Sequence, residues 1–143
     1  LPLNMETVER RLGVSQRVTS FVLPMGMTVN MDGTSLYQAV AAVFIAQVLG
    51  VDLSAGQLLT IVATTTLSSI GTPGVPGGAV VILMMVLSSV GLPAEGLALI
   101  LGLDRPLDML RTVVNVTGDA TVASIVDAHT EPESKNAPGA GAE

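Results

Sequence analysis

The longest stretch without a charged side chain limits the possible folds of this sequence more than any other feature. Residues 53–94 contain no Asp, Glu, Lys or Arg, and from Val18 to Val51 the only charged residue is Asp32. Charged residues make up 13% of the chain, whereas soluble domains have about 25%. Uncharged apolar stretches of about 18 or more residues are candidates for membrane insertion. We therefore expect an all-α membrane protein.

The charge-free stretch is divided by a Gly/Pro-rich segment, residues 71–78, through which no helix would persist. The flanking runs 56–70 and 78–91 would each rise about 22 Å as helices, less than the hydrocarbon thickness of about 30 Å. This pattern predicts a re-entrant helical hairpin over 54–91, which enters and leaves the membrane on one face. The alternative is a pair of core helices in a soluble bundle, but those need a polar outer face that these runs lack.

The remaining elements follow from turn-forming residues. We predict a short helix within 1–14 and, from Ser15 as N-cap, a helix over 15–50 that is broken at 30–34. This break has the sequence Asn30-Met31-Asp32-Gly33-Thr34, in which Asn, Asp and Gly favour turns. A long helix over 94–128, kinked at Pro106, follows the hairpin. The small polar residues 130–143 predict a disordered tail.

Polar residues form one stripe along the last predicted helix, because their spacing places them within an arc of about 100°. The stripe consists of Asp108, Arg111, Thr112, Asn115 and Asp119. Asp104 extends it by one turn if a kink at Pro106 does not turn it away. An ionised group at mid-membrane costs about 2.5–3.5 kcal/mol, so the stripe must face protein, water or a ligand. A salt bridge between Asp108 and Arg111 is one explanation, but it leaves Asp119, Asn115 and Asp32 unexplained.

A bound ligand explains the whole stripe. The planar fork of arginine suits a carboxylate, and an aspartate one turn away suits an ammonium group. Carboxylate, amide and main-chain oxygens suit an alkali cation. Broken helices whose ends face substrate and ions near the middle of the membrane recur in secondary transporters. These features predict a site for a zwitterion with an acidic side chain and for small cations.

Composition argues against other functional classes. The chain has no Cys, and its one histidine, His129, lies just after the last predicted helix, so a metal site built from Cys and His is excluded. No glycine-rich stretch carries the lysine of a phosphate-binding loop. No basic, aromatic surface for nucleic acid is present. We expect neither an enzyme nor a nucleic-acid-binding protein.

Three segments carry a family resemblance: residues 30–34, the Gly/Pro segment 71–78, and Asp108-Met109-Leu110-Arg111-Thr112-Val113-Val114-Asn115-Val116-Thr117-Gly118-Asp119. Together they closely resemble the glutamate transporter family, the dicarboxylate/amino acid:cation symporters. The resemblance covers about residues 1–129. It implies the C-terminal part of a transport domain that moves across a scaffold in an elevator-like cycle. It also implies a fragment of a sodium-coupled homotrimer in a bacterial-type plasma membrane, multi-pass, with a cytoplasmic C-terminus and no cofactor besides Na⁺.

The resemblance also implies roles for individual residues. Arg111 would bind the side-chain carboxylate of the substrate and Asp108 its amino group. The other implied substrate contacts are Thr34, Thr112, Asn115, Val75, Pro76 and Gly77. The implied sodium ligands are Gly26, Asn30, Asn115 and Asp119; Thr28 with Ser69, Ile70 and Thr72; and Asn30 with Asp32, with Met31 among them.

Two positions bear on the substrate and the driving ion. By the resemblance, carriers of neutral amino acids usually lack the arginine and plain dicarboxylate carriers the aspartate, so Arg111 and Asp108 together favour aspartate or glutamate. Gln38 stands where related vertebrate members have a proton-carrying glutamate, so we do not expect proton co-transport by that route. Two alternatives stay open. One is a proton-coupled C4-dicarboxylate or neutral amino acid symporter, and the other is a non-transporting membrane interaction module.

Overall fold

The computed structural model describes residues 1–70 and 78–130, and every regular element within these residues is a helix. The predicted all-helical class is therefore confirmed. In chain order the elements are α1 (Pro2–Leu12), α2 (Gln16–Val29), α3 (Asp32–Val48), α4 (Ala55–Ser69), α5 (Gly78–Ser89), the 3₁₀ helix η1 (Ala94–Leu97), α6 (Ala98–Leu101) and α7 (Asp104–His129). Within the described ranges, no helix combines the length and apolarity that a membrane crossing requires.

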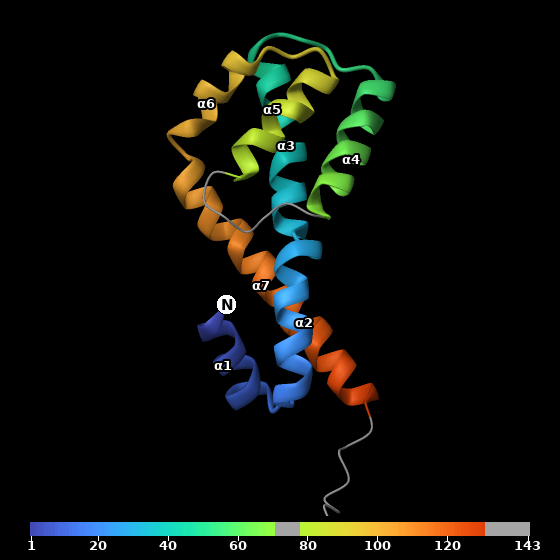
Figure 1. The fold of residues 1–143 in the computed structure, drawn as a ribbon. Coiled ribbons are helices and arrows are strands. Elements are labelled where there is room, and N and C mark those ends of the chain that lie inside the picture. The colour runs from blue at the N-terminus through green and yellow to red at the C-terminus, as the bar shows by residue number, and fades with distance from the viewer. Residues whose placement is uncertain (71–77, 131–143) are drawn as a thin grey trace, which may run out of the picture.

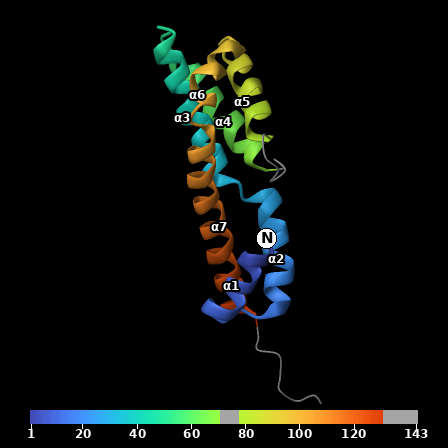
Figure 2. The ribbon, with the colours of Figure 1, turned by 90° about the vertical axis from the view of Figure 1, so that its left-hand side faces the viewer.

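The molecule is elongated, and α7 runs beside α3 in one half and beside α2 in the other (Figures 1 and 2). Helices α2 and α3 follow one another almost end to end. The chain leaves helical geometry at Asn30 (φ −116°, ψ 62°) and Met31 (φ −97°, ψ 46°). The break lies at the start of the turn-favouring sequence, where Asn, Asp and Gly favour turns, and the Asn30 side chain donates to Asp119 of α7.

The prediction of one helix over 94–128 with a kink at Pro106 is wrong. Two short helices, η1 and α6, precede α7, and the chain turns at Gly102 and Leu103. Glycine is a poor helix former, which favours a break at this position. Pro106 lies in the first turn of α7, where a missing N–H costs no helical hydrogen bond. Asp104 and Asp108 therefore belong to the same helix.

Helices α4 and α5 pack against α3 around an apolar core. The centre of this core consists of Ala42, Ile45, Ile61, Leu83 and Leu87. Ser54 and Gln57 form a capping box at the start of α4, and Gln57 Nε2 also donates to the Val90 carbonyl at 3.0 Å. One amide thus joins the start of α4 to the end of α5. Residues 71–77 of the predicted hairpin tip lie outside the described residues, as do all residues of the predicted tail after Thr130.

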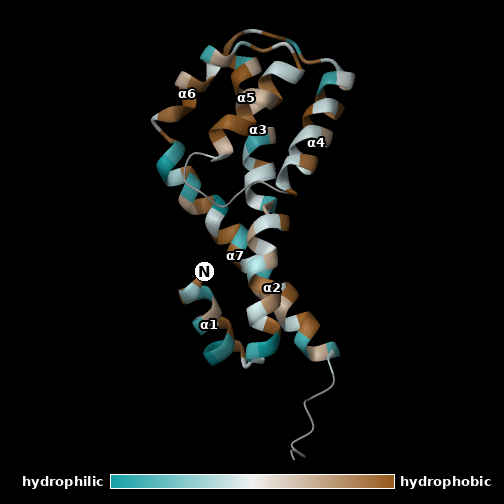
Figure 3. Ribbon diagram, in the orientation of Figure 1, coloured by the Kyte–Doolittle hydropathy of each residue, from teal (hydrophilic) through white to brown (hydrophobic). Residues whose placement is uncertain are grey.

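The opposite end of the molecule is a small cluster of α1, the start of α2 and the end of α7. Gly13 ends α1 in the left-handed region (φ 73°), where glycine carries no steric penalty. An apolar group at this base of the molecule, the basal cluster, joins the three helices: Val8, Val14, Val18, Leu23 and Ala123. Figure 3 shows hydrophilic residues concentrated at this end and hydrophobic residues dominating α5.

Candidate functional site

Polar side chains meet where α7 crosses the break between α2 and α3. Asn115 of α7 accepts a hydrogen bond from the Gly33 N–H at 2.8 Å. Its Nδ2 lies 3.2 Å from Met31 Sδ and 3.4 Å from Thr34 Oγ1. The first N–H groups of a helix have no partner within that helix, so Asn115 satisfies one donor that the break exposes. This contact places the predicted residues Met31, Thr34 and Asn115 together.

Glycines permit the close approach of these helices. A Cβ on Gly26 would lie 2.2 Å from Asp119 Oδ1, and one on Gly33 would lie 2.5 Å from the Arg111 carbonyl oxygen. A Cβ on Gly118 would lie 2.8 Å from Asn30 Nδ2. A larger residue at Gly33 would meet the backbone of α7 and push it away from the break, whereas one at Gly26 or Gly118 would displace the side chain of Asp119 or Asn30. The sequence suggested a role for Gly26 as a ligand, but not this steric role.

Asp119 lies at the centre of this crossing. Its side chain is 4% exposed and accepts a hydrogen bond from Asn30 Nδ2 at 2.9 Å. Within the described part of the chain, no ion pair neutralises it. A buried carboxylate without a cation is costly, so this environment favours a bound positive charge.

The residues around Asp119 fit an alkali cation. Asn30 and Asn115 carry amide oxygens, and Gly26 places its backbone against the carboxylate. Hard cations take such carboxylate, amide and carbonyl oxygens as ligands. Over residues 1–70 and 78–130, no three acidic or histidine side chains gather as a metal site. Of the predicted set, Gly26, Asn30 and Asp119 thus lie together, and Asn115 lies one turn before Asp119 on α7, where it bonds to Gly33.

Arg111 forms a second centre on the same face of α7, two turns before Asp119. Its side chain is 6% exposed. Nε donates to Asp108 Oδ1 at 2.9 Å, and Nη2 lies 2.8 Å from the same oxygen and 3.2 Å from Asp104 Oδ1. Nη1 is buried and has no hydrogen-bond partner among the residues that the structure describes. The guanidinium therefore retains an unused donor.

Tyr37 completes this centre and was missed by sequence reasoning. Its ring lies under the guanidinium, with Arg111 Cζ 4.4 Å from the ring centre, and its hydroxyl donates to Asp104 at 3.2 Å. A cation over an aromatic face is attracted by the ring quadrupole. The spacing along the last helix suggested Asp104. No spacing connects Arg111 to Tyr37, because Tyr37 lies on α3.

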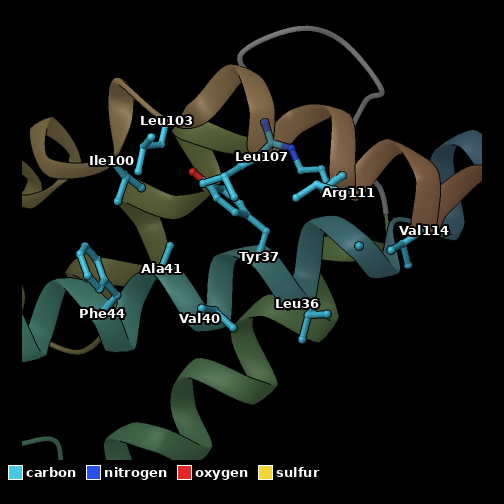
Figure 4. A pocket seen from close by; sticks show the side chains of 12 residues that line it. Leu36, Tyr37, Val40, Ala41, Phe44, Ile100, Leu103, Leu107, Arg111 and Val114 are labelled. Atoms are coloured by element: carbon cyan, nitrogen blue, oxygen red, sulfur yellow. The ribbon is translucent and has the colours of Figure 1, made fainter.

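Among the described residues, two hollows border the site. One, of about 380 Å³, lies between α3, α6 and α7, with Arg111 and Tyr37 on its wall among apolar side chains (Figure 4). The other, of about 500 Å³, lies beside the break and is lined by Asn30, the exposed Asp32 and Thr117 among others. Each hollow thus touches one of the two polar centres.

Several predicted residues do not join these centres. Thr112 is exposed, and its hydroxyl donates to the Asp108 carbonyl within α7. The Thr28 hydroxyl donates to the Met25 carbonyl and the buried Ser69 hydroxyl to the Thr66 carbonyl, so no hydrogen bond of the described residues joins Thr28 to Ser69. Ile70 is exposed. The remaining predicted residues lie outside the described ranges: Thr72, Val75, Pro76 and Gly77.

Gln38 is fully buried between α3 and α5. Its Nε2 lies 3.5 Å from the Ala79 carbonyl, and its Oε1 has no partner within the described residues. A neutral amide thus occupies a position where an ionised carboxylate would be costly.

Comparison with known proteins identifies relatives over almost the whole chain. An excitatory amino acid transporter of Caenorhabditis elegans is 53% identical over 126 residues, which are 88% of this chain and 25% of the relative. Excitatory amino acid transporter 3 of Mus musculus is 54% identical over 127 residues, 89% of this chain and 24% of the relative. Excitatory amino acid transporter 1 of Rattus norvegicus is 49% identical over 136 residues, 95% of this chain and 25% of the relative.

The chain therefore spans about a quarter of the length of these relatives. The profile of the sodium:dicarboxylate symporter family matches residues 1–129. With identities of about half over nearly the whole chain, this match shows that the protein belongs to the sodium:dicarboxylate symporter family.

Proposed function

We propose that this chain carries the substrate and sodium sites of a secondary transporter that moves aspartate or glutamate across a membrane together with sodium ions. The observation that carries the proposal is Arg111. Its side chain is buried beside two carboxylates, yet Nη1 has no partner within the described residues. A buried donor without a partner favours an acceptor from a bound molecule. A carboxylate is the acceptor that matches the guanidinium fork.

The neighbours of Arg111 suit a zwitterion. Asp104 and Asp108 together exceed the single charge of Arg111, so a simple anion would meet net negative charge. A ligand that brings an ammonium group as well as carboxylates avoids this repulsion, because the ammonium group can lie against Asp108. That carboxylate is partly exposed and so can accept a new partner. Aspartate and glutamate have this combination of groups.

Sodium would bind at Asp119, where a buried carboxylate accepts from the Asn30 amide and lies against Gly26. Asn115 connects this centre to the substrate centre, because it lies one turn from each along α7 and bonds to Gly33 in the break. A cation that draws Asn30 and Asp119 together would order the break and thereby fix Asn115 and Thr34. Sodium and substrate would then each favour binding of the other.

The chain would act as the C-terminal part of a transport domain within a longer protein. The match to about a quarter of each relative supports a place within a longer protein, and the C-terminal position comes from the resemblance of the sequence. So do the large apolar side chains that stay exposed, among them Leu59, Leu67 and Met109, each 70% exposed. Exposed apolar surface of this extent marks contact with lipid or further protein. The complete protein would be a homotrimer in a bacterial-type plasma membrane with a cytoplasmic C-terminus, working by an elevator-like movement.

The test is Arg111→Ala in the complete transporter that carries this chain, reconstituted in proteoliposomes. We expect uptake of labelled aspartate under an inward sodium gradient to fall by at least about 100-fold, since a charge-assisted bidentate contact is lost. Arg105→Ala is the matched control, because Arg105 is an exposed arginine at the start of the same helix. Uptake at normal affinity in Arg111→Ala would contradict the proposal.

A second candidate is transport of a C4-dicarboxylate, which the description of the family favours. Competition separates the two substrates. Unlabelled aspartate should displace labelled aspartate in the presence of sodium, whereas succinate and serine should not. Effective competition by succinate, together with uptake that Asp108→Asn leaves unchanged, would favour the dicarboxylate.

A further inference from the structure

The N-terminus of α2 is capped by a residue from another helix. Ser15 occupies the N-cap position, but its side chain makes no hydrogen bond to its own helix. Its backbone N–H and its hydroxyl instead donate to Asp127 Oδ1, at 3.1 Å and 2.6 Å. Asp127 lies in the last turn of α7, 112 residues further along the chain. A cap is normally a local oxygen, so this one links two helices.

The link joins helices that also meet at the candidate sodium site. Helices α2 and α7 run antiparallel (Figure 2). They contact at Ser15 and Asp127 at one end and at Asn30 and Asp119 at the other, with apolar side chains of the basal cluster between. The two carboxylates are about 12 Å apart along α7. Because helices are stiff over this distance, a contact at one end restricts the register at the other.

At the candidate sodium site, α2 can shift only slightly against α7 before the contacts between them are lost. Gly26 lies so close to Asp119 that even a methyl group would overlap, and Asn30 reaches Asp119 with a single hydrogen bond. A small rotation or slide of α2 would separate these groups. The negative charge of Asp127 also lies at the positive end of α2, which favours this arrangement.

We propose that Asp127 is a positioning residue: by capping α2 from α7, it holds Gly26 and Asn30 opposite Asp119. As far as sodium is concerned, this inference rests on the function proposed above. A second contact at the base, between the buried Thr19 hydroxyl and Glu9 of α1, holds α2 from its other side. The two contacts together fix the start of α2 between α1 and α7.

The experiment uses the complete transporter and four variants. Asp127→Ala removes the link, and Asp127→Asn keeps an acceptor oxygen at the same place. Asp127→Ala with Ser15→Asp restores a local cap, because aspartate is a strong N-cap residue, but does not restore the contact with α7. Asp52→Ala is the matched control, since Asp52 is an exposed aspartate between α3 and α4. Sodium half-saturation of uptake, the substrate KM at saturating sodium and amide hydrogen exchange are measured for each.

We expect Asp127→Ala to raise the sodium concentration for half-maximal uptake about fivefold. The reason is that the arrangement with Gly26 and Asn30 opposite Asp119 is populated less often. The substrate KM at saturating sodium should change less than about twofold, because excess sodium restores the register. Asp52→Ala should resemble the wild type, and Asp127→Asn should lie closer to the wild type than to Asp127→Ala, because it keeps the acceptor oxygen and loses only the charge at the start of α2. The double variant should recover exchange protection in the first turn of α2 but not the sodium affinity.

Two outcomes would overturn the inference: an unchanged sodium half-saturation in Asp127→Ala, or its full recovery by Ser15→Asp, which would assign the effect to helix capping alone. A wild-type protein without sodium dependence would instead contradict the proposed function. Hydrogen exchange then still decides the positioning role. Asp127→Ala should raise amide hydrogen exchange near residues 26–30 and 115–119. An increase confined to the first turn of α2 would contradict the positioning role of Asp127.

Discussion

At the scale of single residues, the candidate site depends on groups whose environments differ from those of surface charges. Arg111 and Asp119 are both nearly inaccessible, and both face the α2–α3 pair. Among residues 1–70 and 78–130, Arg111 has two carboxylate partners, whereas Asp119 has one neutral amide. The first centre retains an unused donor and the second an unneutralised negative charge. Each therefore favours a different kind of ligand.

Gly26→Ala should impair the sodium centre without unfolding the protein. The added Cβ would overlap Asp119 Oδ1, so either the Asp119 carboxylate must rotate away or α2 must move away from α7. We expect sodium half-saturation of uptake to rise about tenfold or more, equivalent to about 1.4 kcal/mol of lost contact. Gly56→Ala in the first turn of α4 is the control, because its Cβ meets nothing closer than Ser54 Oγ at 3.9 Å. Equal behaviour of the two variants would show that the close approach is irrelevant to sodium.

Substitutions of Tyr37 should distinguish the contribution of its ring to substrate binding from that of its hydroxyl. Tyr37→Phe keeps the ring beneath Arg111 and loses the bond to Asp104, so we expect the substrate KM to rise about twofold to fivefold. Tyr37→Leu also removes the cation–π contact, and the KM should rise further, by about tenfold. Uptake kinetics at saturating sodium measure both values. A larger effect for Phe than for Leu would contradict the role of the ring.

At the scale of elements, the break between α2 and α3 and the turn before α7 bring the polar groups to the same level of the molecule. The break exposes the Gly33 N–H, which Asn115 accepts. The turn at Gly102 and Leu103 lets α7 begin at Asp104, so Asp104, Asp108 and Arg111 occupy successive turns of one unkinked stretch. A kink at Pro106 would have turned Asp104 away from Arg111.

Gln57 should contribute to stability through both ends of its amide. Its Oε1 accepts from Ser54, and its Nε2 donates to the Val90 carbonyl. Gln57→Glu keeps the acceptor and loses the donor, so we expect a loss of about 1 kcal/mol in the free energy of unfolding. Gln57→Ala should cost about 1 kcal/mol more, because it also removes the capping box. Thermal unfolding in detergent measures both, and equal losses would assign the whole contribution of Gln57 to its bond with the Val90 carbonyl.

At the scale of the whole molecule, the chain presents much apolar surface that its own helices do not cover. Side chains such as Leu3, Leu59 and Met109 are at least 70% exposed, although the basal cluster and the α3–α4–α5 core are closely packed. Two small cores bury too little to cover every apolar face. This fits a chain whose surroundings are lipid or other parts of a larger protein.

Residues 1–143 alone should not transport. Reconstituted into liposomes, they should give no sodium-driven aspartate uptake above empty vesicles, because the proposed scaffold is absent. The same residues in place of the matching quarter of mouse excitatory amino acid transporter 3 should restore uptake. The graft carrying Arg111→Ala serves as the inactive control. Uptake by the isolated chain would contradict its proposed place in a larger transporter.

The sequence by itself determined the helical class, the position of the break and the common face of Arg111, Asn115 and Asp119. Each of these depends on local turn chemistry or on the helical period. The tertiary structure decided what those residues contact. Tyr37 beneath Arg111, Gly26 against Asp119 and Asp127 on Ser15 all join helices that are remote in sequence. Packing between remote helices depends on the shape of both surfaces, and no spacing within one segment contains that information.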